Sequence, residues 1–143
     1  VWIGGGEERN QITAPNIKIT GWFLEKKQVY EQINALDIYL QTSLWEGLPI
    51  AVLEAMALMK PVIATKINGN KDTVIPNETG FLYQEMSELT AYFKTLEDPL
   101  TRVKFGTKAL YRCKDLFDTN KNFTALEKVY ERYFFAATKD SQK

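Results

Sequence analysis

Histidine is absent from this 143-residue chain, and cysteine occurs once, as Cys113. One cysteine excludes a disulfide within the chain, and the lack of imidazole removes the usual catalytic base and most zinc ligand sets. Net charge is lacking too, because 18 basic residues balance 18 acidic ones. No overall field therefore draws the chain to nucleic acid or to an anionic membrane surface.

Long apolar segments are also missing. No run approaches the roughly 20 apolar residues of a spanning helix, and the N-terminus lacks the basic and then apolar order of a signal peptide. With the cysteine content, this predicts a soluble, cytoplasmic protein, which at most touches the inner face of a membrane. Val1, Trp2 and Ile3 start the chain like a buried strand, so we expect a fragment of a longer protein.

Short apolar runs alternate with helical patterns over much of the chain. Strands separated by single helices need crossover connections, which build a parallel sheet with helices on both faces. We predict one doubly wound, Rossmann-like α/β domain over 1–143 that ends in a helical segment. The expected strands are 1–5, 17–21, 37–41, 61–65 and 81–83. The expected helices are 7–13, 26–36, 49–59, a short one within 68–75, 87–98, 99–113 and 120–137.

One carboxylate in the stretch SLWEGLPIAVLEAMALMKPVIAT, residues 43–65, needs an explanation. Glu54 is the only polar residue between Gly47 and Met59, and a carboxylate in apolar surroundings requires a partner. In doubly wound sheets, ligands bind beyond the carboxyl ends of the strands. The loops to search are therefore those after Thr20, Gln41 and Thr65.

The start of the helix in this stretch suits an anion. Pro49 fits the first helical position, where its missing N–H costs nothing. The amides of Ile50, Ala51 and Val52 are then free, and the helix dipole favours negative charge there. Gly47 lets a ligand come close to the backbone. The pattern predicts a phosphate site.

Two acids flank this helix start. Glu46 precedes it, and Glu54 lies more than one turn inside the helix. Neither suits a bare phosphate, but one carboxylate can accept hydrogen bonds from two neighbouring hydroxyls. Phosphate with sugar hydroxyls on both sides describes a nucleotide sugar. The alternative is an ordinary core helix, in which Glu54 pairs with a lysine such as Lys60 or points to solvent.

The order of these motifs resembles the donor-binding half of a retaining glycosyltransferase of the GT-B fold, specifically of glycosyltransferase family four. Glu46 and Glu54, with seven residues between them, match the family's signature. The neighbouring segments ITGWF, ALDIYLQTS, KPVIAT, NGNKDTVI and NETGFLY match its strands and loops in order. The likeness covers roughly the first 85 residues. It implies that the first strand of this domain and an acceptor-binding domain would precede Val1.

The resemblance implies roles for single residues. Glu54 would bind the ribose hydroxyls, and Glu46, the candidate catalytic residue, would contact the transferred sugar. The base would lie beside Trp22 and Phe23, for which ordinary packing is the alternative. The diphosphate and sugar would be held by the backbone amides of Gly47, Leu48, Ile50 and Ala51.

The resemblance also implies a reaction. A sugar would pass from a nucleotide-diphosphate sugar to a glycan or lipid-linked acceptor, with retention, in polysaccharide or capsule-type biosynthesis. It implies no cofactor and no obligatory metal. The 143 residues alone should bind the donor weakly and transfer nothing. The alternatives are a sugar-nucleotide epimerase of the same two-domain architecture and a nonenzymatic, flavodoxin-like binding module.

Three positions depart from the family pattern. Met59 replaces a glycine that usually ends the signature helix, and a side chain is costly in a left-handed cap, so the turn there is expected to differ. Asn68 replaces the first of two glycines, and Asp72 replaces a glutamate.

Overall fold

A three-stranded parallel sheet forms the centre of the computed structural model, which describes residues 1–140 apart from the side chains of residues 8 and 135–140. The strands follow one another in the order β1 (Tyr39–Gln41), β2 (Val62–Thr65) and β3 (Gly80–Tyr83). Tyr39 is in register with Val62, and Val62 with Gly80. The parallel sheet predicted from the crossover pattern is confirmed.

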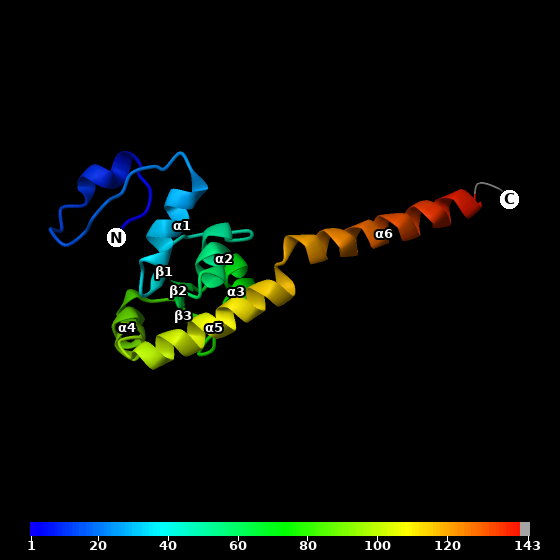
Figure 1. Cartoon of the computed structure of the whole chain (residues 1–143). Helices are drawn as coiled ribbons and strands as arrows, with labels where there is room; N and C mark the ends of the chain where they lie inside the picture. Colours follow the sequence, from blue (N-terminus) through cyan, green and yellow to red (C-terminus); the bar gives the residue numbers. More distant parts are fainter. Residues whose placement is uncertain (141–143) are drawn as a thin grey trace.

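Helices cover both faces of this sheet (Figure 1). Val62 and Ala64 face α1 (Lys26–Asn34), α2 (Ile50–Ala57) and the second half of α5 (Pro99–Leu116), whereas Ile63 faces α4 (Leu89–Thr95). The alternation along β2 explains why this strand is buried on both sides. The remaining elements are η1 (Glu7–Gln11), α3 (Asn68–Thr73), η2 (Met86–Glu88) and α6 (Thr119–Asp140).

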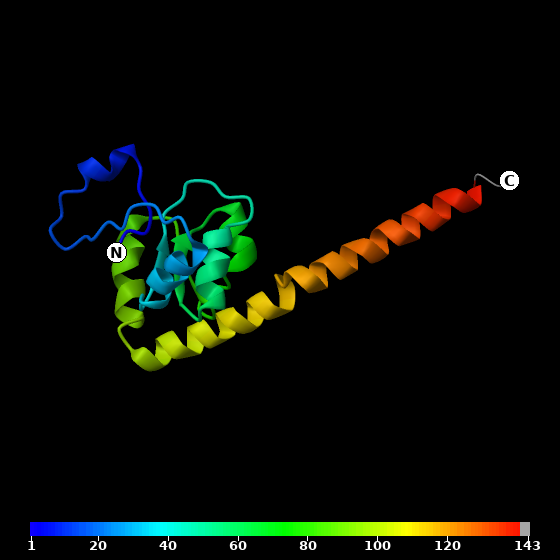
Figure 2. The same ribbon diagram turned by 45° about the horizontal axis from the view of Figure 1, so that its top comes forward.

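The last helix leaves the body of the molecule. α5 crosses the sheet region and α6 continues outward as an extended arm, as both views show (Figures 1 and 2). Its large apolar side chains are exposed, namely Phe123, Leu126, Val129, Tyr130, Tyr133 and Phe134. No helix within the described part of the chain is long and apolar enough to cross a membrane.

The N-terminal segment differs from the prediction. The structure describes the backbone of residues 1–25 without a strand, so the strands expected at 1–5 and 17–21 are wrong. Isolated bridges join Trp2 to Ile19 and Gly4 to Gly21. Gly4 and Gly21 have φ values of 117° and 75°, which are incompatible with extended strands. A single 3-10 turn, η1, replaces the helix expected at 7–13.

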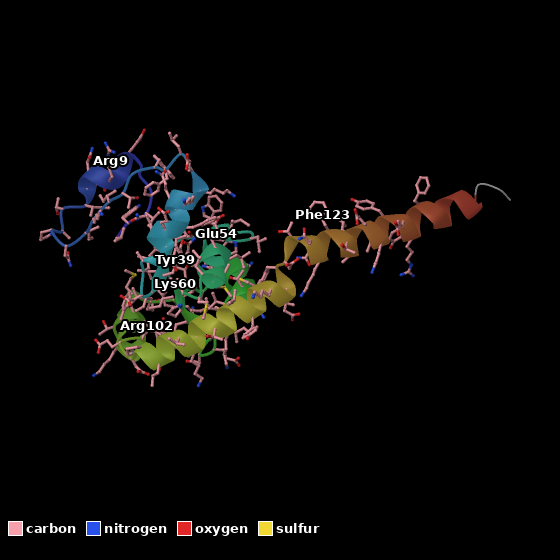
Figure 3. The ribbon with its side chains drawn as sticks, viewed as in Figure 1. Arg9, Tyr39, Glu54, Lys60, Arg102 and Phe123 are labelled. Carbon is pink, nitrogen blue, oxygen red and sulfur yellow. The ribbon has the colours of Figure 1, made fainter. Side chains whose placement is uncertain are left out.

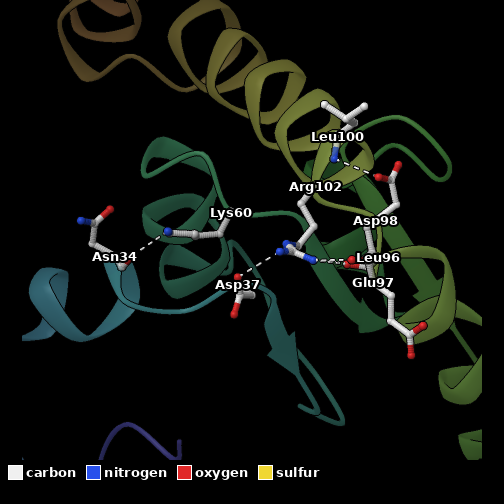
Figure 4. Close-up of polar contacts among 8 residues, drawn as sticks. All are labelled: Asn34, Asp37, Lys60, Leu96, Glu97, Asp98, Leu100 and Arg102. Carbon is white, nitrogen blue, oxygen red and sulfur yellow. Dashed lines mark hydrogen bonds and ion pairs between the residues drawn. The ribbon is translucent and has the colours of Figure 1, made fainter.

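Polar contacts tie the start of β1 to α5 and to the turn between α4 and α5 (Figure 4). Arg102 of α5 pairs with Asp37, just before β1, at 3.3 Å, and donates hydrogen bonds to the carbonyl oxygens of Leu96 (2.8 Å) and Glu97 (2.9 Å). These contacts leave the opposite, carboxyl edge of the sheet to the loops that carry the signature.

α2 packs closely against α5. A Cβ on Gly106 of α5 would overlap the carbonyl oxygen of Met59, so only glycine fits there. Cys113 of α5 is buried, and its thiol lies 3.6 Å from the carbonyl oxygen of Leu53. Burial raises the pKa of this thiol. The contact fixes the orientation of α2, which carries Glu54.

The turn that ends α2 keeps a left-handed residue. Met59 has a φ of 58°, its N–H donates to the Met56 carbonyl at 3.0 Å, and the N–H of Lys60 donates to the Ala55 carbonyl at 3.0 Å. Together these are the two bonds of a Schellman motif. The expectation that methionine would change the turn is therefore wrong, and the chain tolerates the strain instead.

Met59→Gly is expected to stabilise the fold by about 0.5–1 kcal/mol. Glycine adopts this φ without steric cost, and this gain outweighs the additional chain entropy that glycine loses on folding. Urea unfolding followed by circular dichroism should show a higher midpoint. Leu58→Gly is the matched control, because Leu58 has a φ of −91° and should only lose stability. A midpoint for Met59→Gly at or below that of the parent chain would contradict the prediction.

Candidate functional site

The predicted ligand loops meet at the carboxyl edge of the sheet. β1 runs into the loop formed by residues 42–49, and β2 runs into α3. A Cβ on Gly69 of α3 would lie 2.8 Å from the Glu46 carbonyl oxygen and would overlap that of Gly47. The backbone of α3 therefore touches the loop between the strand and the signature helix, and only glycine allows this approach.

A network of hydrogen bonds from Thr65 and Asn70 anchors the same loop. The Thr65 hydroxyl donates to the Ser43 carbonyl at 2.6 Å, and the Asn70 side-chain amide donates to the Thr65 carbonyl (2.9 Å) and hydroxyl oxygen (3.1 Å). Asn70 is fully buried, and its Oδ1 finds no hydrogen-bond partner among the described residues. Ser43 is thus fixed through its backbone.

Glu46 is half-buried and held by a side chain of β1. Gln41 Nε2 donates to Glu46 Oε1 at 2.8 Å and to the Ser43 hydroxyl at 2.9 Å. Gln41 Oε1 in turn accepts the Tyr39 hydroxyl at 3.1 Å. The sequence patterns missed Gln41 and Tyr39. The one available signal was that the two residues are two positions apart on a strand, so their side chains lie on the same face.

Glu54 faces a small cavity of about 190 Å³. Trp22, Phe23 and Ala51 also line the cavity, so with Glu54 it brings together four of the residues predicted for the donor. Tyr39 lines it as well. Glu54 belongs to α2 and Tyr39 to β1, and both residues are labelled in Figure 3. The Tyr30 hydroxyl, which the sequence patterns also missed, donates to Glu54 Oε1 at 3.3 Å.

The lysine proposed as an alternative partner of Glu54 is engaged elsewhere. Lys60 Nζ donates to the Asn34 carbonyl oxygen at 2.6 Å, at the end of α1 (Figure 4). The alternative in which Glu54 pairs with Lys60 is therefore wrong. Glu54 is half-buried, so full exposure to solvent does not describe it either.

Both signature acids act on one half-buried phenol, that of Tyr39. Burial, then the charge of Glu54, then that of Glu46 raise the pKa of Tyr39 to about 12. The hydroxyl of Tyr39 thus keeps its proton at any physiological pH and acts as a donor. The structure brings Glu46 and Glu54 to the same locality, as their spacing predicted.

The helix start between the acids is open. Pro49 is the N-cap, one residue outside α2 rather than its first residue, and within the described chain no side chain caps the helix. The first-turn amides, which include those of Ile50 and Ala51, have no intrahelical acceptor. A Cβ on Gly47 would meet no heavy atom of the described chain within 4 Å. Space for a ligand therefore exists above Gly47.

The side chains of Leu48 and Ile50 turn away from the cavity. They are 52% and 55% exposed and line a separate apolar groove of about 330 Å³ with Phe117 and Phe123. Only their backbone amides can serve the helix start, and the resemblance implies a role for these amides alone.

Residues 3–110 match the sequence profile described as "Glycosyl transferases group 1". The chain belongs to this family. The UDP-Gal:alpha-D-GlcNAc-diphosphoundecaprenol alpha-1,3-galactosyltransferase of Escherichia coli is 32% identical over 105 residues, which cover 67% of this chain and 26% of the relative. The chain thus spans about a quarter of the length of the curated relatives it matches.

Solved structures agree with this family. Sucrose-phosphate synthase of Thermosynechococcus elongatus superposes with a TM-score of 0.73 at 27% identity, over 83% of this chain and 30% of that one. Anabaena Alr3699/HepE in complex with UDP and glucose gives 0.70 at 25% identity, over 82% of this chain and 32% of that one. The fold is a Rossmann-like domain of the GT-B glycosyltransferases.

Proposed function

We propose that the chain is the donor-binding part of a retaining glycosyltransferase, which moves a sugar from a nucleotide-diphosphate sugar to a glycan or lipid-linked acceptor. One observation carries the proposal: along a single edge lie the cavity with Glu54, the uncapped start of α2 and the carboxylate of Glu46. Family membership supports sugar transfer over epimerisation or a nonenzymatic binding role.

The nucleoside would occupy the cavity. Trp22 and Phe23 offer faces for a base, and Glu54 offers acceptors for the ribose hydroxyls. At about 190 Å³ the cavity is smaller than the roughly 300–1,000 Å³ of complete ligand pockets. It therefore suits one part of a nucleotide sugar, with the remainder lying across the open loop.

The diphosphate would lie at the start of α2. Amides of Gly47, Leu48, Ile50 and Ala51 would meet the negative charge that grows on phosphate as the nucleoside diphosphate leaves. Since these dipoles are fixed before the reaction, they stabilise that charge without reorganisation. Glu46, on the far side of the helix start, would accept hydroxyls of the transferred sugar.

We propose no cofactor and no obligatory metal for this site. Among the residues whose side chains the structure describes, no three histidine, cysteine, aspartate or glutamate side chains gather into a group that could hold a metal ion by itself. The acceptor would be bound by another part of the enzyme, since the match covers only 26% of the Escherichia coli relative.

Titration calorimetry of the 143-residue chain tests the proposal. UDP-glucose, UDP-galactose and GDP-mannose form the panel, and at least one should bind, weakly, with the same affinity in the presence of EDTA. No sugar transfer or donor hydrolysis is expected from the chain alone. Absence of binding across the panel would overturn donor binding, loss of binding with EDTA would overturn the metal-free site, and turnover would contradict the expected inactivity.

A further inference from the structure

The side chain of Glu46 accepts a hydrogen bond from a neutral side chain of the sheet, that of Gln41. Tyr39 and Gln41 are separated by two positions on β1, so their side chains emerge on the same face. A chain of bonds runs from the Tyr39 hydroxyl to Gln41 Oε1, and from Gln41 Nε2 to Glu46 Oε1. The strand thereby reaches across to the loop that follows it.

Only one arrangement of protons satisfies this chain. An ionised carboxylate only accepts hydrogen bonds, so the amide group that faces Glu46 must be the NH₂ of Gln41. The amide oxygen then faces Tyr39, which must donate. The raised pKa of Tyr39 keeps that proton in place. Gln41 is therefore locked in one orientation from both ends.

We propose that Gln41 is a positioning residue for Glu46, whose Oε1 it occupies so that Oε2 points to the transferred sugar of the donor. The proposal rests on the proposed function, because it needs Glu46 to contact that sugar. It assigns to a strand residue a part in sugar recognition that the signature segment itself does not contain.

A neutral amide suits this task better than a cation. Lysine or arginine at position 41 would form a charge-assisted pair and compete with the sugar for the carboxylate. Glutamine fixes the geometry and leaves the full negative charge to the ligand hydroxyls. An acceptor held in advance also loses less conformational entropy when the sugar binds.

The loop backbone has its own anchor, which separates positioning from folding. Thr65 binds the Ser43 carbonyl oxygen, and Gly69 packs on the backbone of Glu46 and Gly47. Removal of the Gln41 amide therefore releases the Glu46 side chain while the loop stays in place. The amides that would hold the diphosphate should be unaffected.

The test compares two ligands on one variant. Gln41→Met keeps the length of the side chain but removes its donor. The probes are whichever of UDP-glucose, UDP-galactose and GDP-mannose binds the parent chain most tightly and the matching free nucleoside diphosphate. Affinity for the sugar nucleotide should fall about three- to tenfold, and affinity for the free diphosphate by less than about twofold.

Controls and a second variant keep the outcomes distinct. Gln28→Met, at an exposed glutamine of α1, should change neither affinity. Gln41→Glu replaces the donor by a like charge beside Glu46, so it should lower sugar-nucleotide affinity further than Gln41→Met. If the methionine variant does not fold, Gln41→Glu takes its place in the test.

Equal losses for both ligands, or no loss for either, would overturn the positioning role. Donor binding that depends on Glu54 but not on Gln41 would sink this inference and leave the proposed function standing. A parent chain that binds none of the probes would overturn the proposed function and this inference with it.

Discussion

Glu54→Ala is expected to weaken binding of a nucleoside diphosphate by about 10- to 100-fold. The carboxylate would lose its bonds to the ribose hydroxyls, and a hydrogen bond to a charged group contributes about 1.5–3 kcal/mol. Stability should change little, because the partner of Glu54 in the structure is the Tyr30 hydroxyl at 3.3 Å, in an exposed bond. Calorimetry with UDP or GDP, whichever the parent chain binds, measures the effect.

Two variants separate the role of Glu54 from general charge effects. Glu78→Ala removes an acid that pairs with Lys108 at 3.1 Å on the surface, and it should leave affinity unchanged. Tyr30→Phe removes only the hydroxyl that contacts Glu54, so it should weaken binding severalfold at most. An affinity for Glu54→Ala within about twofold of the parent chain would rule out the ribose role.

Gly69→Ala is expected to destabilise the fold by about 2–3 kcal/mol and to weaken donor binding as well. The new methyl group would overlap the carbonyl oxygen of Gly47 and lie 2.8 Å from that of Glu46, and neither is the free end of a flexible side chain. Insertion of a group into a filled space typically costs about 1–3 kcal/mol through backbone shifts. Here the shift would move the loop that carries Glu46. Denaturant unfolding and calorimetry together measure both effects.

Gly47→Ala is the matched control for Gly69→Ala. Gly47 has no left-handed φ, and its Cβ would meet open space in the described chain, so stability should stay within about 0.5 kcal/mol of the parent. Binding should still weaken, because the methyl group would stand where the ligand approaches. Parent-like stability in Gly69→Ala would show that α3 does not press on the loop.

Local patterns predicted the α/β architecture well where each strand is flanked by its own helices. The segments around β1, β2 and β3 have this form. Residues 1–5 and 17–21 also have strand-like composition, but a strand requires a neighbour as well as a pattern. In the structure their backbones pair only at isolated bridges, and Gly4 and Gly21 turn the backbone out of the extended region.

The sequence predicted the two acids of the candidate site, but not the side chains that form hydrogen bonds with them. The spacing of Glu46 and Glu54 indicated that both would lie near one helix start, and the structure agrees. Tyr30 and Gln41 could not be singled out, because a tyrosine on a helix or a glutamine in a strand becomes a ligand-site neighbour only through tertiary contacts. Met59 is the opposite case. The steric cost of a left-handed methionine predicted a changed turn, but the turn is kept where α2 packs on α5.

The single thiol gives the chain a built-in reporter of internal opening. Cys113 lies where α5 packs on α2, against Leu53, and its burial also lowers the reactivity of the sulfur by disfavouring the thiolate. A disulfide reagent can reach it only when the two helices separate. The rate of its modification, followed with and without nucleotide, therefore records how tightly ligand binding clamps the helix that carries Glu54, with no engineered label.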